Sequence, residues 1–476
     1  MEEEPKMKRL ERMQPKVGVL ALTLDLYETL APGLREEREE WFRSKILPAL
    51  EPTADVAFDK AVFTRTDIEA QVGRFETAGV DTLLVVLLTY SPSQLVLPAL
   101  KRTRLPIIVW NTQELLAVDD HFDTPAMMAN HGVHGTQDLC NVLVRSGVDF
   151  EYVTSHLIDE DAIHVLEDFF RAAAAVGRLR KARLGLIGYP FPSMGDFALD
   201  TTHLAATLGC QWLNVPVEAY VNRAEAATPK AVAEILSAYR EHYDVAAEIT
   251  DRDLEATARV EVALRGIVSD HGLDAVAYQF TAFGDDERTP TVPFVAASRL
   301  MAEGVGFGGE GDLISAAGTT FLNWLNPPAS FSEIFTIDFE GNSVFMSHMG
   351  EANVAMARSG NKVRMVAREA PITRTRRGQL ALVTSFEAGP ATLMALTLGP
   401  GGRWRLIASA TTIADWGPLD SMDVPHFKLA PGGDVREFLT AYAKAGGPHH
   451  NAVCFGDARE RLKAAAKLLD ADYCEV

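Results

Sequence analysis

Four residues in the C-terminal half of the chain have types and local contexts suited to metal-assisted chemistry. They are Glu310 in GFGGEGD, Glu333 in ASFSEIF, His348 in MSHMGEA and His450 in GGPHHNA. Two carboxylates and two imidazoles together can hold one divalent ion, and the carboxylates can also take up and release protons. The set therefore predicts metal-assisted proton transfer on a small polyhydroxylated molecule.

The segment around Glu310 is the densest glycine cluster in the chain. Gly304, Gly306 and Gly309 formally satisfy the G-x-G-x-x-G pattern of dinucleotide sites. That pattern must follow a strand and open a helix, whereas residues 296–303 read as a helix, so a nucleotide site is disfavoured. Glycines beside Glu310 instead allow unusual backbone angles that would aim its carboxylate into a cavity. A flexible loop carrying a surface glutamate is the alternative.

The other candidates are individually ambiguous. Glu333 has apolar neighbours, and a buried glutamate is rare unless it is paired or bound to a metal. His348 lies in an apolar stretch, where a histidine packed in the core is the common case. His449 and His450 follow a glycine turn and point in different directions, so that one could bind metal while the other contacts a substrate. Packing without a ligand remains the alternative for each histidine.

The spread of these residues over the sequence excludes compact metal motifs and predicts a site assembled by tertiary structure. The donor set suits Mn²⁺ or another divalent ion such as Co²⁺ or Mg²⁺, with positions left for substrate oxygens. Structural zinc is more typically bound by thiolates, and the four cysteines form no CxxC pair.

Composition limits the classes of partner. The formal net charge of −20 argues against nucleic acid and anionic membranes, because both require clustered lysine and arginine. The charged N-terminus has no secretory apolar region, and no apolar run approaches the length of a membrane helix. Together with well-separated cysteines, which suit reduced thiols, these features predict a cytoplasmic protein.

Apolar runs alternate with helical stretches over the first two thirds of the chain. Residues 17–22, 82–88 and 107–110, and later 184–188 and 274–280, read as buried strands of two parallel sheets. Thr66 and Glu69 have the spacing of a capping box that begins a helix. Short β-rich segments follow: 362–370, 379–386, 391–398 and 403–413.

The predicted fold class is α/β, with two Rossmann-like parallel-sheet domains followed by a C-terminal antiparallel β-barrel-like domain. The expected boundaries are 1–15 for an N-terminal extension, 16–180 for the first domain, 181–328 for the central domain and 329–476 for the barrel domain.

Several motifs together resemble the L-arabinose isomerase family and the wider L-fucose/L-arabinose isomerase-like group. The clearest match is residues 299–312, RLMAEGVGFGGEGD, supported by SFSE at 330–333, SHM at 347–349 and GGPHH at 446–450. Their order and separations also match. The resemblance implies a three-domain subunit and a Mn²⁺-dependent aldose–ketose isomerase that acts on an unphosphorylated sugar. It further implies a homo-oligomer, a hexamer or another trimer-based assembly.

The resemblance also implies residue roles. Glu310, Glu333, His348 and His450 would form the metal site, and the two glutamates would also transfer protons. The expected substrate contacts are Phe283, His449, His134 and Leu26, the last two from the N-terminal domain of a neighbouring subunit.

The sequence departs from the family pattern in the substrate pocket. Leu24 stands where the family has a glutamine that contacts sugar, and Leu313-Ile-Ser-Ala replaces the usual Trp-Lys-Thr-Ala. Arabinose is therefore less well supported as the substrate than isomerisation is as the reaction. A metal-dependent epimerase or aldolase with the same site, or a non-catalytic sugar-binding protein, remains the alternative.

Overall fold

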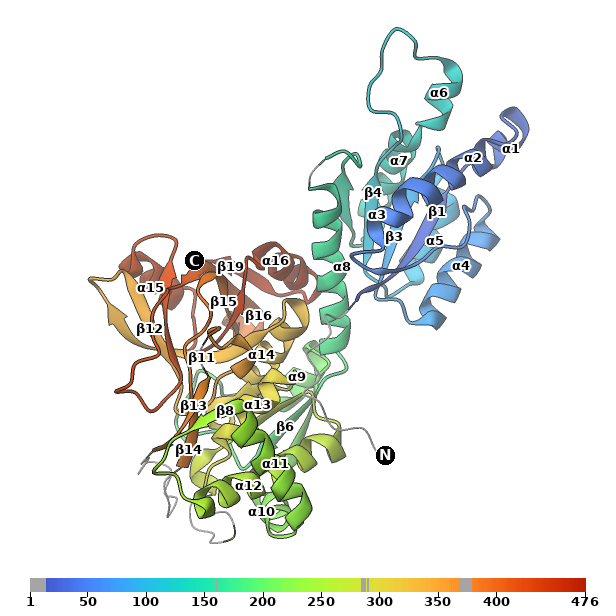
Figure 1. The fold of residues 1–476 in the computed structure, drawn as a ribbon. Coiled ribbons are helices and arrows are strands. Elements are labelled where there is room, and N and C mark those ends of the chain that lie inside the picture. Colours follow the sequence, from blue (N-terminus) through green and yellow to red (C-terminus); the bar gives the residue numbers. More distant parts are fainter. Residues whose placement is uncertain (1–13, 160, 284–287, 289–290, 361, 369–378) are drawn as a thin grey trace. The chain divides into compact units, whose positions relative to one another are not determined.

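The chain folds into two compact units in a computed structural model, one from Met13 to Gly177 and one from Arg178 to Val476. The structure describes residues 14–159, 161–283, 288, 291–360, 362–368 and 379–476 (Figure 1). None of the helices in these ranges combines the length and the apolar composition that crossing a membrane requires.

The first unit is built on a five-stranded parallel sheet, as predicted. Its strands are buried apolar runs, and Thr82–Leu87 is buried at every position because helices pack on both faces of such a sheet. The strands, in sheet order, are β2 (Asp55–Ala57), β1 (Lys16–Leu22), β3 (Thr82–Leu87), β4 (Ile107–Asn111) and β5 (Glu151–Thr154). The helices are α1 (Asp25–Leu30), α2 (Leu34–Trp41), α3 (Leu47–Leu50), α4 (Arg65–Ala78), α5 (Ser93–Arg102), α6 (Thr124–Ala129), α7 (Gly132–Arg145) and α8 (Ala162–Leu179), which runs past the end of the unit.

Helix α4 begins two residues earlier than the sequence suggested. Its N-cap is Thr64, whose hydroxyl accepts a hydrogen bond from the Asp67 N–H at 3.2 Å. The predicted Thr66–Glu69 capping box is therefore wrong. Thr64 and Asp67 have the same three-residue spacing, and Thr64 is the threonine with the extended backbone that a cap requires.

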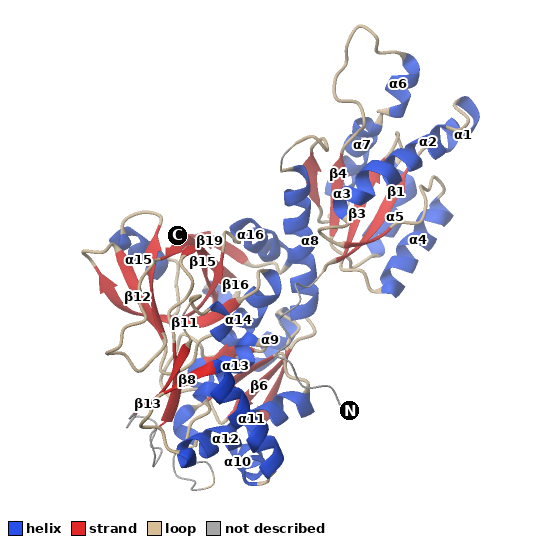
Figure 2. Cartoon of the chain, viewed as in Figure 1, coloured by secondary structure: helices blue, strands red, loops and turns tan. Residues whose placement is uncertain are grey.

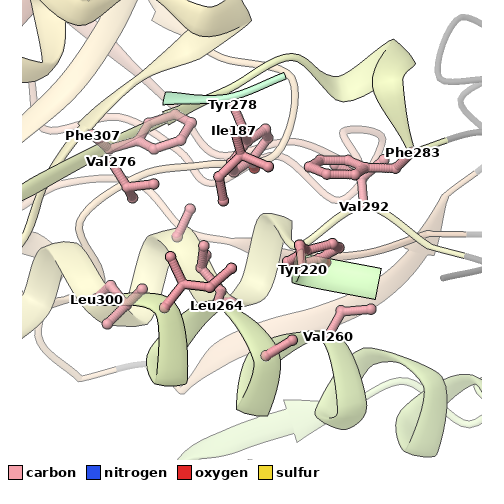
Figure 3. Packing of buried hydrophobic residues seen from close by; sticks show 14 of the residues in the cluster. Ile187, Tyr220, Val260, Leu264, Val276, Tyr278, Phe283, Val292, Leu300 and Phe307 are labelled. Atoms are coloured by element: carbon pink, nitrogen blue, oxygen red, sulfur yellow. The ribbon is translucent and has the colours of Figure 1, made fainter. Parts of the chain in front are cut away.

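The second unit begins with another parallel sheet, again as predicted. In sheet order its strands are β10 (Gly306–Gly308), β9 (Ala275–Tyr278), β6 (Arg183–Ile187) and β7 (Gln211–Val215). The accompanying helices are α9 (Thr201–Thr207), α10 (Val217–Glu225), α11 (Pro229–His242), α12 (Asp251–His271), α13 (Phe294–Ala302) and α14 (Leu313–Leu325). Figure 3 shows part of the core between this sheet and its helices, where Tyr278 of β9 and Phe307 of β10 lie above Leu264 of α12.

The C-terminal region forms a closed antiparallel barrel of six strands, which confirms the predicted fold class. The barrel closes because β15 pairs with β16 as well as with β18. Its strands, in order, are β15 (Gly389–Leu398), β18 (His450–Phe455), β11 (Ala329–Asp338), β12 (Ser343–Ser347), β17 (His426–Pro431) and β16 (Trp404–Ile413). Strand β19 (Asp472–Glu475) adds to β16 in parallel, and the helices are α15 (Val435–Lys444) and α16 (Arg459–Leu468).

Two segments assigned to the barrel from sequence lie elsewhere. β13 (Val363–Arg368) and β14 (Gln379–Val383) form a separate three-stranded sheet with β8 (Tyr243–Val245), a strand that follows α11. Residues 369–370 of the first predicted segment lie outside the described residues. This placement was therefore wrong, because β-rich composition predicts strands but does not identify which strands pair with one another. Figure 2 shows β8 and β13 below the barrel strands β11 and β12.

Phe283, predicted to contact sugar, is a core residue of the second unit. It is fully buried, and its ring centroid lies 4.8 Å from that of Tyr220 and 5.7 Å from that of Tyr278 (Figure 3). Its role as a sugar contact stays a prediction.

We expect Phe283→Ala to lower the free energy of unfolding by about 3–5 kcal/mol, because it removes a large side chain from a packed interior. Phe335→Ala is the matched control, since Phe335 is 47% exposed and its loss should change stability by less than about 0.5 kcal/mol. Urea unfolding followed by circular dichroism measures both. Equal effects of the two substitutions would contradict this assignment of Phe283 to the core.

Candidate active site

The barrel brings Glu333 and His450 together through the register of its strands. Glu333 on β11 lies directly opposite His450 on β18 and, on its other side, opposite Ser347 on β12. Directly opposed residues of antiparallel strands have Cβ atoms roughly 5 Å apart. His348 is the residue after Ser347. Three candidates that are far apart in the sequence therefore meet at one level of the barrel.

Glu310 reaches the same place from the parallel sheet. It lies in the short connection between β10 and α14, with φ of +58°, an angle that costs a residue with a Cβ roughly 1 kcal/mol. The Phe191 N–H donates a hydrogen bond of 2.9 Å to the Glu310 carbonyl. A Cβ at Gly309 would lie 2.8 Å from His348 Nε2, so this position must be glycine for the connection to pass so close to the imidazole.

Four side chains place one ligand atom each within 4.8 Å of one another: Glu310, Glu333, His449 and His450. His450 Nε2 is 3.1 Å from Glu333 Oε1 and 3.7 Å from Glu310 Oε2. His449 Nε2 is 3.5 Å from Glu310 Oε2 and 3.7 Å from Glu333 Oε1. The structure thus brings together three of the four predicted metal ligands, and His449 takes the fourth place in this group.

His348, the remaining predicted ligand, lies beside the group rather than in it. Its ring centroid is 6.2 Å from that of His450, and the Phe331 ring packs edge-on against both imidazoles. His348 Nε2 is buried and has no hydrogen-bond partner among the described residues. Buried polar atoms are nearly always satisfied, so this nitrogen indicates a partner of another kind, and a metal ion fits the donor set.

Carboxylates orient all three imidazoles, and sequence reasoning did not identify these carboxylates. His348 Nδ1 is 2.6 Å from Glu351, His450 Nδ1 is 2.8 Å from Asp312, and His449 Nδ1 is 2.5 Å from Asp196. Such bonds fix the ring orientation and direct Nε2 toward the site. Asp312 and Glu351 lie within three residues of a candidate, a signal that could have identified them. Asp196 lies far away in sequence and gave no such signal.

The charges of the site shift its pKa values. Burial acts to lower the pKa of His450, but hydrogen bonds with Asp312 and Glu333 raise it to about 10. Burial likewise opposes protonation of His348, yet the carboxylates of Glu351 and Glu333 raise its pKa above the ordinary value. Burial acts to raise the pKa of Glu333, but the neighbouring imidazoles, His348 foremost, lower it. Glu333 is therefore ionised at neutral pH.

We expect a divalent ion to displace protons when it binds here. A ligating imidazole must be neutral, whereas a pKa of about 10 keeps His450 protonated at neutral pH. Because protons compete with the metal ion for the site below that pKa, the affinity for the metal ion should rise by about tenfold for each unit by which pH increases and for each proton displaced. Mn²⁺ titration calorimetry at one pH, in two buffers of different ionisation enthalpy, measures the protons released. The same heat in both buffers would contradict the expectation.

The predicted contacts His134 and Leu26 belong to the first unit. His134 Nδ1 is 2.8 Å from His131 Nε2, and His131 Nδ1 is in turn 3.1 Å from the Tyr27 hydroxyl. Leu26 is 56% exposed on α1. Their contact with a sugar stays a prediction.

Known proteins resemble the chain over most of its length. Residues 183–326 match the L-arabinose isomerase central domain, and residues 328–472 match the L-arabinose isomerase C-terminal domain. The L-arabinose isomerase of Acidothermus cellulolyticus is 28% identical over 80% of this chain and 77% of its own length. Those of Nocardioides sp. and Geobacillus kaustophilus are 26% and 25% identical, over 87% and 90% of this chain and 85% and 86% of their own lengths.

Proposed function

Because the chain belongs to the L-arabinose isomerase family and is an aldose–ketose sugar isomerase, an intramolecular oxidoreductase, we propose that it acts on an unphosphorylated sugar through an enediolate with the help of a divalent metal ion. The observation that carries the proposal is the convergence of Glu310, Glu333 and His450, with the buried and unpartnered Nε2 of His348 beside them.

The proposed metal ligands are Glu310, Glu333, His348 and His450. Mn²⁺ is the proposed ion, with Co²⁺ and Mg²⁺ as alternatives. A divalent ion bound there would act as a Lewis acid that stabilises negative charge on the sugar oxygens.

The protein's own groups move the protons. One of the two glutamates removes the proton from the carbon next to the sugar carbonyl. The other takes up or releases a proton at the opposite end of the same two-carbon unit. The ionised state of Glu333 suits it to accept a proton. His449, which is only partly buried and faces both glutamates, is proposed to contact the sugar. Phe283, His134 and Leu26 are the further proposed substrate contacts.

We also propose the broader organisation of the protein. A cytoplasmic location is consistent with four free cysteines. The proposed assembly is a homohexamer or another trimer-based oligomer. The proposed domains are 16–180, 181–328 and 329–476, after an extension over 1–15, and the separate matches to a central and a C-terminal domain support the last boundary.

The decisive experiment is a substrate screen. Purified protein with added Mn²⁺ is incubated with unphosphorylated tetroses, pentoses and hexoses, and the products are identified by NMR. We expect one or more aldoses to be converted into the corresponding ketose. Products of carbon–carbon cleavage, or an epimer without ketose, would instead favour an aldolase or an epimerase. Tight sugar binding in the absence of metal, without turnover, would favour a binding protein.

A further inference from the structure

The connection between β6 and α9, residues 188–200, lies against the candidate site at several points. Phe191 holds the backbone of Glu310 through its N–H. The Phe197 ring stacks on the His450 ring, with centroids 5.4 Å apart and an interplanar angle of 11°. Asp196 lies between these two contacts in the same connection. Part of the site geometry therefore depends on a segment that carries none of the proposed metal ligands.

Asp196 makes two hydrogen bonds to His449. Its Oδ2 accepts a hydrogen bond from the His449 backbone N–H at 3.1 Å and lies 2.5 Å from His449 Nδ1. The two contacts fix both the backbone position of His449 and the plane of its ring. His449 Nε2 then faces Glu310 and Glu333.

We propose that Asp196 is a positioning residue that holds the His449 ring with its Nδ1–H bonded to Asp196 and its Nε2 directed at the two glutamates. The effect on catalysis rests on the proposed function, whereas the effect on the His449 ring does not. An ionised carboxylate accepts hydrogen bonds and does not donate them, so Asp196 accepts from both the backbone N–H and the Nδ1–H of His449 and thereby fixes the plane of the ring.

Exposure explains why His449 depends on its carboxylate more than the other two imidazoles do. The side chains of His348 and His450 are 4% and 1% exposed, so packing already restrains their rings. The His449 side chain is 39% exposed. The other described contacts of the ring are Nε2 to Glu310 at 3.5 Å and the rings of Phe197 and His450, and none of these holds Nδ1.

The test compares Asp196→Asn with Asp200→Asn. Asparagine keeps the size of Asp196 but lacks its negative charge, so it holds the Nδ1 proton less strongly, and its amide N–H can face Nδ1 instead. Asp200 is the matched control in the same connection, because it caps α9 through the Thr202 and His203 N–H groups and is not bonded to His449. Two-bond ¹H–¹⁵N spectra of histidine-labelled, metal-free protein report directly which ring nitrogens carry a proton. A His449→Gln variant identifies the signals.

We expect the wild type and Asp200→Asn to show a proton on Nδ1 of His449, and Asp196→Asn to lose that proton in a large share of the molecules. On the sugar found in the screen, Asp196→Asn should lose kcat by about 10- to 100-fold with little change in KM or in Mn²⁺ affinity. An unchanged Nδ1 signal and an unchanged kcat in Asp196→Asn would overturn the proposal, as would an Nδ1 without a proton in the wild type. If the wild type isomerises no sugar, the proposed function fails, and the spectra alone still decide the role of Asp196.

Discussion

Replacing either glutamate of the site by glutamine should abolish useful turnover while the fold remains. We expect kcat of Glu310→Gln and of Glu333→Gln to fall by about 10²- to 10⁴-fold, the range that a positioned proton-transfer group contributes. The amide keeps the shape of the side chain but cannot accept a proton from carbon. The strand register that holds Glu333 beside His450 does not depend on this charge, so circular dichroism and thermal unfolding should remain close to those of the wild type.

Two measurements separate proton transfer from metal binding. Turnover is measured at saturating Mn²⁺, so that a weakened metal site is refilled. Incorporation of solvent deuterium into the sugar in D₂O then reports carbon–proton exchange independently of net conversion. Glu340→Gln is the matched control, because Glu340 is exposed beyond the end of β11, and it should retain both activities. Glutamine variants that exchange deuterium at the wild-type rate would refute the proton-transfer roles.

Removing His348 should weaken metal binding much more than removing His449. We expect His348→Ala to lower Mn²⁺ affinity by about 100-fold or more, because losing a ligand should exceed the 10- to 100-fold effect of losing an outer partner. His348 is buried, its Nδ1 is held by Glu351, and its Nε2 has no partner among the described residues, as expected of a ligand. His449→Ala should retain the metal and lose kcat.

Calorimetry and the electron paramagnetic resonance signal of free Mn²⁺ measure these affinities without any sugar. The two alanine variants serve as controls for each other, since both remove one imidazole from the same neighbourhood. The opposite pattern, with affinity lost in His449→Ala and kept in His348→Ala, would assign the fourth ligand to His449. That outcome would match the four-residue group in which His449 lies within 4.8 Å of the others.

Much of the architecture could be predicted from sequence because buried parallel strands are continuous apolar runs. Residues 82–88 are an example, and the observed strand Thr82–Leu87 is buried throughout. The assignment of residues 362–370 and 379–386 to the barrel failed because a strand pattern does not name the partner strand. An alternating segment indicates that a strand has two different faces, but which strands pair is decided by tertiary packing. In this chain β13 lies between β14 and β8, and none of the three pairs with a barrel strand among the described residues.

The candidate site was predictable in its residue types but not in its arrangement. Glu310, Glu333 and the histidines were identified by unusual local contexts and by a resemblance. Whether His348 or His449 lies closest to the glutamates depends on strand register and on the direction of single side chains, which local sequence does not encode. Asp196 could not be identified at all, because its bond to His449 joins positions that only folding brings together.

Glu333 is paired with both Ser347 and His450, and this pairing limits where residues can be inserted or deleted in the chain. Side chains alternate between the two faces of a strand, so one residue added or deleted within β11 or β18 would turn Glu333 or His450 away from the site. The turn that joins β11 to β12, residues 339–342, lies beyond the pairs that hold Glu333. Length variation among homologues should therefore accumulate in such turns and be absent from the strand segments that carry the site.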